Sequence, residues 1–264
     1  MINGSSALAV PYSGLKGEYA RIPSEYDLMP FYEHSSRLKI DGIRWNQQRL
    51  DVDLKTGLHY HANIPVGYGL GSSGALTAGT FDRYMIKDRQ LSTQELRGVF
   101  QQMESFFHGS SSGIDPLVSY LKEGVLIQNK EVEIITPIAT DQYLFYLADT
   151  GISRRTSPLV ELYHEKYTSE SFRKQIEHLT TLNTQAISAY LQQSTELIDV
   201  FQKISQLQQE HFTEMIPEHM QGPVVKYSLK LCGAGGGGFF LGCCRMEDKE
   251  DIAKDLNPTF LIDN

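Results

Sequence analysis

Residues 63–75 read Asn63-Ile64-Pro65-Val66-Gly67-Tyr68-Gly69-Leu70-Gly71-Ser72-Ser73-Gly74-Ala75. Glycine stands at every second position from 67 to 71. Because glycine adopts positive φ without steric cost, this backbone can curl tightly. Two serines follow, and the next residues, 75–78, are compatible with a helix. A glycine loop that opens into a helix presents unpaired N–H groups and the positive end of the helix dipole to an anion.

The residues just before this loop alternate in polarity. Leu58, Tyr60, Ala62 and Ile64 are separated by polar residues, which is the pattern of a half-buried strand. The order of strand, glycine loop, serine pair and helix predicts a phosphate-binding cradle. The alternative is a glycine-rich turn that binds no ligand. The loop is not a Walker A motif, because no Gly-Lys-Ser/Thr ending follows.

Composition limits the class of protein. The 264 residues suffice for one large or two small domains with a proper core. Hydrophobic residues make up 41% and charged residues 21%, which is typical of folded rather than disordered chains. The formal net charge of −8 disfavours a nucleic-acid-binding surface, since such surfaces are usually basic.

The sequence carries no sign of a membrane span or leader. No apolar run approaches the roughly 18 residues of a membrane helix, and the N-terminal residues lack the basic and apolar segments of a signal peptide. Cys232, Cys243 and Cys244 form neither a CxxC pair nor a disulfide framework. Buried thiols in a reducing compartment are the simplest interpretation, so we expect a cytoplasmic protein. The oligomeric state stays open, with a homodimer among the options.

The first half of the chain combines strand and helix signals. Residues 1–60 look β-rich, and Asp41-Gly42 between two short apolar segments predicts a hairpin with a type I′ turn over 38–45. The helix after the cradle is expected to run to about Lys87. Next, Ser92-Thr93-Gln94-Glu95 has the form of a capping box, and apolar residues at helical spacing follow it. We expect this amphipathic helix to end at Gly109.

The second half is predicted to begin with strands over 124–128 and 143–148 and to continue as helices over 158–221. Breaks are expected near Thr168-Ser169 and Pro217, and the last long helix carries an apolar stripe. Strands over 226–232 and 239–244 close the chain. This mixture favours an α+β fold in two domains, 1–138 and 139–264.

A second glycine loop, Gly233-Ala234-Gly235-Gly236-Gly237-Gly238, formally contains G-x-G-x-x-G. A dinucleotide-binding fold needs a helix directly after that motif, but Phe239-Phe240-Leu241 is strand-like, so we reject a nicotinamide site. Two interpretations stay open: a loop that approaches another loop or a ligand closely, and a purely structural hairpin.

Two acids are candidates for chemistry. Glu104 falls at the border of the apolar stripe of its helix, so its carboxylate could line a cleft. Asp115 follows a serine–glycine loop, a common position for a side chain aimed into a site. Each is also interpretable as a surface charge. His59-x-His61 could ligate a metal, but it lacks a third ligand nearby, and an exposed strand face explains it more simply.

Four segments together resemble the GHMP kinases, and among them mevalonate kinase. Residues 65–74 are similar to the signature P-x-x-x-G-L-G-S-S-A, and residues 230–238 to K-L-T-G-A-G-G-G-G. Residues 104–115 are similar to the mevalonate kinase segment E-x-x-x-H-G-x-P-S-G-x-D, and residues 149–156 to D-T-G-x-x-x-x-T. The four lie in the family's order along the chain.

The resemblance implies a two-domain GHMP kinase fold, with an N-terminal domain like ribosomal protein S5 and a ferredoxin-like, helical C-terminal domain. It implies an ATP- and Mg²⁺-dependent kinase that phosphorylates an alcohol on a small molecule, with mevalonate kinase and isoprenoid biosynthesis as the nearest model. Asp115 would be the catalytic base, Ser73 and Glu104 the magnesium ligands, and Thr156 and His108 substrate residues. The nucleotide would contact Gly67, Gly69, Leu70, Gly71, Ser72, Ser73, Gly74, Gly233, Ala234, Gly235 and Gly236.

The chain also departs from the family pattern. The family opens with a strand P-G-K-x-x-L-x-G-E-H that supplies a lysine beside the catalytic aspartate, and this sequence begins after it. We therefore expect a fold without its first strand. Either the start of the sequence is truncated or misassigned, or the protein has lost the lysine and with it catalysis. Gly74, Ser111 and Cys232 replace the usual alanine, proline and threonine. The alternatives to a mevalonate-kinase-like enzyme are a sugar kinase of the same superfamily, a non-catalytic nucleotide- or metabolite-binding protein, and a remnant of the fold that binds nothing.

Overall fold

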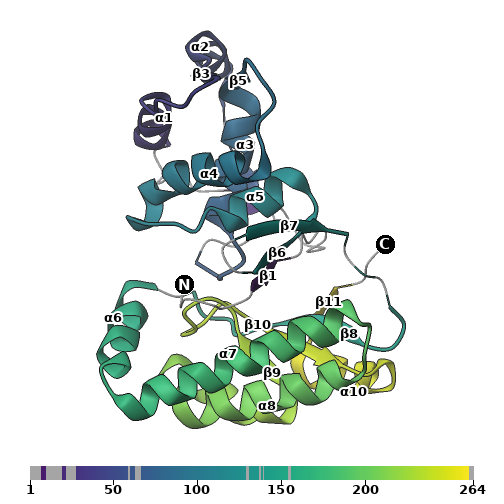
Figure 1. Cartoon of the computed structure of the whole chain (residues 1–264). Coiled ribbons are helices and arrows are strands. Elements are labelled where there is room, and N and C mark those ends of the chain that lie inside the picture. Colours follow the sequence, from purple (N-terminus) through teal and green to yellow (C-terminus); the bar gives the residue numbers. More distant parts are fainter. Residues whose placement is uncertain are drawn as a thin grey trace.

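The computed structural model describes residues 7–9, 20–21, 28–58, 60–62, 67–128, 131–136, 138, 140–153 and 156–261. These residues form two lobes, one above the other in Figure 1. Each lobe has its own hydrophobic core, one built from residues between 31 and 127 and the other from residues between 143 and 252. The predicted α+β two-domain fold is confirmed. The exact boundary at 138/139 stays a prediction.

The upper lobe contains helices α1 (Met29–Ser36), α2 (Gln47–Lys55), α3 (Ser72–Tyr84), α4 (Thr93–His108) and α5 (Ile114–Leu121). Its described strands are β1 (Ala7–Ala9), β2 (Ala20–Arg21), β3 (Ile43–Trp45), β4 (His61–Ala62), β5 (Met85–Lys87), β6 (Gly124–Gln128) and β7 (Glu131–Ile135). Strands β1, β6 and β7 form an antiparallel sheet in that order. The buried side chains of Phe81, Phe100 and Leu117 join α3, α4 and α5 in one core.

Helix α4 forms as the sequence predicts. The Ser92 hydroxyl accepts a hydrogen bond from the backbone N–H of Glu95, and the Glu95 carboxylate accepts one from the backbone N–H of Ser92. This reciprocal capping box satisfies N–H groups that the first turn leaves unpaired. Gly109 ends the helix in the left-handed conformation, with φ +72°. The cap at each end fixes where α4 begins and ends, and thereby the position of Glu104 near its last turn.

The β-rich prediction for residues 1–60 is wrong over most of 28–58, where the structure has α1 and α2 and only the short strand β3 between them. The hairpin over 38–45 is also wrong: Ile40 and Ile43 share a single bridge, and β3 pairs with β5 instead. Gly42 has positive φ, but Asp41 is not among the residues with positive φ, so the turn is not of type I′. The strand expected before the cradle reduces to β4 in the described residues, and 63–66 lie outside them.

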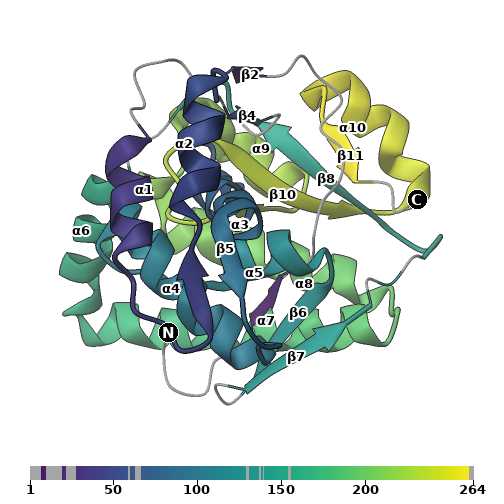
Figure 2. The ribbon, with the colours of Figure 1, turned by 90° about the horizontal axis from the view of Figure 1, so that it is seen from above.

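The lower lobe packs helices against a four-stranded antiparallel sheet. The sheet has the order β11 (Thr259–Leu261), β8 (Leu144–Asp149), β10 (Phe239–Cys244), β9 (Leu229–Leu231). Its helices are α6 (Thr156–Tyr167), α7 (Glu170–Leu191), α8 (Glu196–His211), α9 (Gln221–Lys226) and α10 (Lys249–Leu256), with 3-10 turns at Thr213–Met215, Glu218–Met220 and Met246–Asp248. Figure 2 shows β8 and β10 side by side, with β11 and α10 at one edge.

The pattern of strands and helices predicted for the second half of the chain, from residue 124 on, is largely confirmed. The strands over 124–128, 143–148 and 239–244 correspond to β6, β8 and β10, and the break at 168–169 separates α6 from α7. The apolar stripe Leu197, Phe201, Ile204 and Leu207 is buried. A second break, between α7 and α8, was not predicted. In the part of the chain that the structure describes, no helix is both long and apolar enough to cross a membrane.

Candidate active site

The glycine loop before α3 curls as its sequence predicts. Gly67, Gly69 and Gly71 have φ of +81°, +76° and +72°, values that side-chain-bearing residues rarely adopt. Helix α3 starts at Ser72, directly after the last of them. The N–H groups and the positive dipole end of α3 therefore face the curled loop, which is an arrangement suited to a phosphate. Leu70 and Ser72 lie in the same turn, and Gly74 is buried inside the first turn of α3.

The side chain after this loop meets the end of α4. The Ser73 hydroxyl donates a hydrogen bond to Glu104 Oε1 (3.0 Å) and lies 3.1 Å from His108 Nε2. The Ser111 hydroxyl donates to Glu104 Oε2 and accepts the backbone N–H of Gly113 (2.9 Å). Glu104 is only 5% exposed. The two predicted metal ligands, Ser73 and Glu104, are thus in direct contact, and His108 adjoins them.

Asp115 lies in the first turn of α5, against the same loop. A Cβ atom built on Gly71 would stand 3.3 Å from the Asp115 Cβ atom, and one built on Gly74 would stand 2.7 Å from it. Helices α3 and α5 therefore pack in close contact at this point. The structure brings Gly71, Ser73, Glu104, His108 and Asp115 together from three helices, as the sequence motifs require.

Both carboxyl groups have a raised pKa. Burial is the main cause at Glu104, where the nearby Asp115 also raises the pKa while the hydrogen bonds from Ser111 and Ser73 lower it. Burial of the Asp115 carboxyl group among protein atoms raises its pKa, and the nearby His108 lowers it. The residue as a whole is still accessible to solvent. A pair of acids held with raised pKa values in one site is typical of sites that bind a cation or move a proton.

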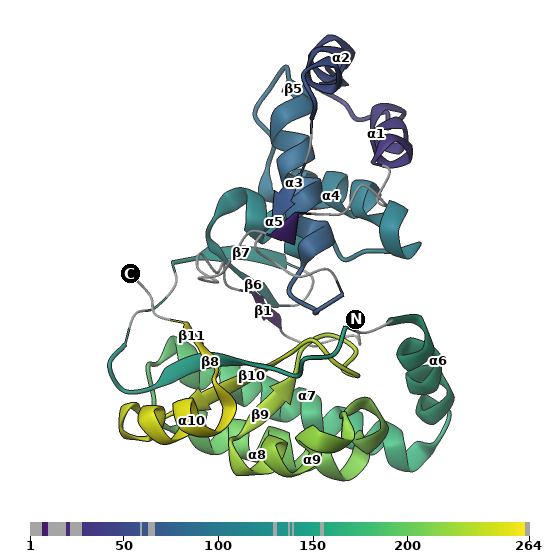
Figure 3. The ribbon, with the colours of Figure 1, turned by 180° about the vertical axis from the view of Figure 1, so that it is seen from behind.

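The second glycine loop reaches the first. The backbone N–H of Phe239 donates to the carbonyl of Tyr68 (3.2 Å), and a Cβ atom on Gly238 would collide with that carbonyl. Figure 3 shows the loop between β9 and β10 on the side of the lower lobe that faces the upper lobe. Of the two interpretations left open by the sequence, the close approach to another loop is therefore the one the structure supports.

Thr150 anchors this contact from the lower lobe. Its backbone N–H (2.9 Å) and its hydroxyl (2.8 Å) both donate to the carbonyl of Gly238, while the N–H of Gly238 donates to the carbonyl of Ile152 (2.7 Å). The sequence pattern indicates Thr150 only as part of the D-T-G element, and it does not indicate Tyr68 and Ser111 as structural parts of the site. These three act through tertiary contacts, which local spacing does not encode.

Some predicted residues cannot be placed in the site. Thr156 begins α6, but its side chain lies outside the described part of the chain, as do His59 and the His61 side chain. Gly233 and Ala234 line a cavity in the lower lobe. Gly235 and Gly236 follow them in the loop, where the N–H of Gly236 donates to the carbonyl of Met215 (2.6 Å).

The oxygen donors near the glycine loop suit a Mg²⁺ ion that is bound together with phosphates. Among the described residues, no three His, Cys, Asp or Glu side chains form a cluster able to hold a metal alone. Mg²⁺ bound with phosphates usually takes one or two protein oxygens and completes its shell with phosphate and water. The Ser73 hydroxyl and the buried Glu104 carboxylate fit that requirement, so these residues suit a metal that arrives with a polyphosphate.

Gly74 offers a direct test of the α3–α5 contact. We expect Gly74→Ala, which restores the family's usual residue, to destabilise the protein by about 1–3 kcal/mol, because its Cβ would stand 2.9 Å from backbone atoms of Asp115 and Pro116. Gly79→Ala in the same helix is the matched control, since nothing lies within 4 Å of its Cβ. That control should stabilise by about 0.5–1 kcal/mol. Equal effects of the two substitutions in urea unfolding would contradict the contact.

Gly238 tests the contact between the two glycine loops. Gly238→Ala should cost about 2–4 kcal/mol, because it places a side chain at φ +72° and against the Tyr68 carbonyl. Gly109→Ala is the control, with the same φ of +72° but nothing within 4 Å of its Cβ. It should cost about 1–2 kcal/mol from backbone strain alone. Thermal unfolding compares the two variants, and a control as unstable as Gly238→Ala would show that the loops do not press together.

Comparison with known proteins shows which families this chain resembles. Residues 42–123 match the model of the GHMP kinases N terminal domain. The mevalonate kinase of Pyrococcus abyssi is 32% identical over 120 residues, which cover 44% of this chain and 35% of that enzyme. The matched segment therefore spans about a third of that relative's length.

Solved structures share the fold over more of the chain. The structure of L. major mevalonate kinase in complex with R-mevalonate aligns with a TM-score of 0.63 at 16% identity, covering 99% of this chain and 90% of that one. Phosphomevalonate kinase from Streptococcus pneumoniae aligns with a TM-score of 0.59 at 14% identity, covering 98% and 92%. The chain thus has the fold of the GHMP kinases and matches the model of their N-terminal domain over residues 42–123. The predicted resemblance to GHMP kinases, and among them to mevalonate kinases, is confirmed.

Proposed function

We propose that this chain is an ATP- and Mg²⁺-dependent kinase that transfers the γ-phosphoryl group to an alcohol of a small molecule, with mevalonate as the first acceptor to test. One observation supports it most: the Ser73 hydroxyl contacts the buried Glu104 carboxylate (3.0 Å) at the helix end that the glycine loop opens into. GHMP kinases are ATP-dependent kinases, and a phosphate cradle beside a carboxylate is what such a reaction requires.

Each residue has a role that follows from its position. The curled backbone at 67–71 and the first N–H groups of α3 bind the phosphate oxygens. Ser73 and Glu104 would hold the metal, which would supply positive charge to stabilise the phosphate oxygens. The second glycine loop, held by Thr150, closes the cradle from the lower lobe.

Asp115 accepts the proton of the attacking hydroxyl. The new bond joins the acceptor oxygen to the γ-phosphorus, the bond from that phosphorus to the bridging oxygen breaks, and ADP leaves. The raised pKa of Asp115 makes its carboxylate a stronger base than an ordinary aspartate. The side chain of Asp115 packs beside Gly71, so base and cradle lie on the same side of α3.

A cavity of about 380 Å³ beside α3 suits the nucleoside end of ATP. Leu76 and Thr80 line it from α3, one and two turns beyond the cradle, and Tyr60 lines it from the segment before the cradle. The cavity lies along the same helix as Ser72 and Ser73, so we assign it to the base and sugar of a nucleotide whose phosphates bind at these serines. In this proposal the aromatic and aliphatic walls bind the base.

The chemistry of the chain also supports a proposal for the compartment. Cys243 and Cys244 are free thiols, and both are buried. Free thiols persist in a reducing environment, so we place the enzyme in the cytoplasm. With mevalonate as acceptor, its product would enter isoprenoid biosynthesis.

The test is an assay of ADP release with the purified chain and a panel of acceptors: mevalonate, phosphomevalonate, galactose and homoserine. We expect ADP release that depends on both Mg²⁺ and mevalonate and exceeds the rate without acceptor. Saturable binding of an ATP analogue with no release on any alcohol would contradict a kinase and favour a nucleotide-binding protein on the same fold. Release on galactose alone would make the chain a sugar kinase.

A further inference from the structure

The lower lobe contains a cavity of about 460 Å³ that lies outside the Ser73–Glu104–Asp115 cluster, although Gly233 and Ala234 of the second glycine loop line it. It lies between α6, α7 and α8, and the second glycine loop forms one wall. Its lining is mainly aliphatic and aromatic, with side chains that include Leu159, Ile176, Leu179, Ile204 and Phe212. None of the lining residues belongs to the Ser73–Glu104–Asp115 cluster. A concave, mostly apolar space of this size is typical of a small-molecule site.

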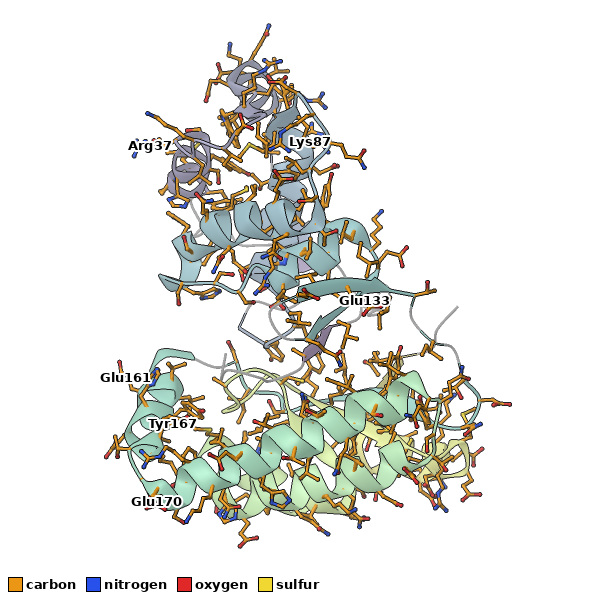
Figure 4. All side chains as sticks on the ribbon, viewed as in Figure 1. Arg37, Lys87, Glu133, Glu161, Tyr167 and Glu170 are labelled. Carbon is orange, nitrogen blue, oxygen red and sulfur yellow. The ribbon has the colours of Figure 1, made fainter. Side chains whose placement is uncertain are left out.

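One cation stands at the edge of this apolar space. Lys230, half-buried on β9, lines the cavity and also a second cavity of about 240 Å³, and the two share Asn183 and Ile204 as well. Lys230 therefore sits at the junction of two adjoining hollows. Figure 4 shows α6 to one side of α7, with Glu161 and Tyr167 labelled on α6.

The described residues provide no carboxylate within ion-pair distance of the Lys230 ammonium group. Four other lysines of the same lobe do have such partners: Lys166 pairs with Glu214, Lys174 with Glu170, Lys226 with Asp255 and Lys254 with Asp251. Lys203 and Lys249 also have no such partner among the described residues, but neither of them lines the cavity. A ligand that covers the apolar surface would also remove water from the lysine ammonium group, which is costly unless the ligand carries a negative charge that pairs with it. This favours a negatively charged ligand over a neutral one.

We propose that this cavity is a binding site for an amphipathic anion, with a short hydrocarbon body in the apolar pocket and a carboxylate or phosphate head on Lys230. The negatively charged head forms an ion pair with Lys230, and the hydrocarbon body removes the apolar surface of the cavity from water. The proposal does not depend on the kinase activity, because no residue of the Ser73–Glu104–Asp115 cluster takes part.

A chain of hydrogen bonds and packing contacts connects the cavity to the kinase site. Met215 lines it and accepts the N–H of Gly236, and a Cβ on Gly236 would collide with Leu159, which also lines it. The same loop ends at Phe239, which donates to Tyr68 in the upper lobe. A ligand in the cavity would thus press on the loop that closes the cradle.

Isothermal titration of the purified full chain tests the site with three probes that share one tail: octanoate, octyl phosphate and octan-1-ol. We expect saturable one-to-one binding of at least one anion, at least tenfold tighter than octan-1-ol, because the anion alone can form a charge-assisted contact with Lys230. The stronger of the two anions identifies the head group. Equal affinity for the alcohol and both anions, or no saturable binding, overturns the proposal.

Two variants locate the binding. Lys230→Met keeps the length of the stem and removes the charge, so the preferred anion should bind about tenfold more weakly while octan-1-ol is unaffected. Val160→Trp narrows the cavity from α6 and should weaken all three probes. Val52→Trp is its matched control, since Val52 is also an exposed valine on a helix but lies in the upper lobe. Unchanged affinity of Lys230→Met for the anion, with an unchanged melting temperature, would contradict the assignment.

Discussion

Replacement of Asp115 by asparagine is expected to lower kcat by about 10²–10⁴-fold, the loss typical of removing a general base. Asparagine keeps the shape of the side chain, so the packing of α5 against Gly71 and Gly74 persists. The measurement is steady-state ADP release with the acceptor that the wild-type chain uses. Full turnover by the variant would remove Asp115 from the reaction.

The pH dependence of the same variant checks the role. Asp115 must be ionised to accept a proton, and its pKa lies above the ordinary value of 3.8. As the pH is lowered, turnover of the wild-type chain should therefore begin to fall at a higher pH than it would with an aspartate of ordinary pKa. Asp115→Asn should lack this acid limb of the pH profile. Because a raised carboxyl pKa means that the ionised form costs stability above that pKa, the variant should keep or slightly raise the melting temperature at neutral pH. A large drop in melting temperature would attribute the lost activity to misfolding.

Replacement of Glu104 by glutamine is the second large effect that we expect. The amide keeps the volume of a buried side chain but removes the negative charge that faces Ser73. The Mg²⁺ concentration for half-maximal turnover should rise at least tenfold, since a hard cation prefers carboxylate oxygen. Turnover measured against Mg²⁺ at saturating ATP gives this value directly.

Glu161→Gln provides the control for charge removal. Glu161 is an exposed residue of α6, labelled in Figure 4, and belongs to no site described above. It should leave the Mg²⁺ requirement unchanged. If both variants shift the requirement equally, the effect arises from overall charge and Glu104 is not a ligand.

The parts of the fold that the sequence predicted are those that local chemistry specifies. Ser92 and Glu95 form a capping box that needs no distant partner, and the glycines at 67–71 allow the positive φ angles of the curled loop without steric cost. The stripe from Leu197 to Leu207 shows its helical period within one segment. Each of these features could therefore be placed to within a few residues.

The parts that were wrong or missed depend on distant partners. Asp41-Gly42 is a strong local turn signal, yet β3 pairs with β5 some forty residues on, a pairing that no local pattern encodes. Within the site, the resemblance of the motifs predicted that Ser73, Glu104 and Asp115 belong to one site. The role of Thr150 was not foreseen, because its carbonyl partner Gly238 is separated from it by 88 residues. Such contacts need the assembled lobes.

The central claim is that the loop at 67–73 binds a polyphosphate whose metal is held between Ser73 and Glu104. A crystal grown with a non-hydrolysable ATP analogue and Mn²⁺ tests it most directly, because Mn²⁺ gives an anomalous signal in place of Mg²⁺. The account predicts an anomalous peak within ligand distance of both the Ser73 hydroxyl and the Glu104 carboxylate, with phosphates on the N–H groups of α3. A nucleotide bound elsewhere, or a metal that contacts neither side chain, would contradict it.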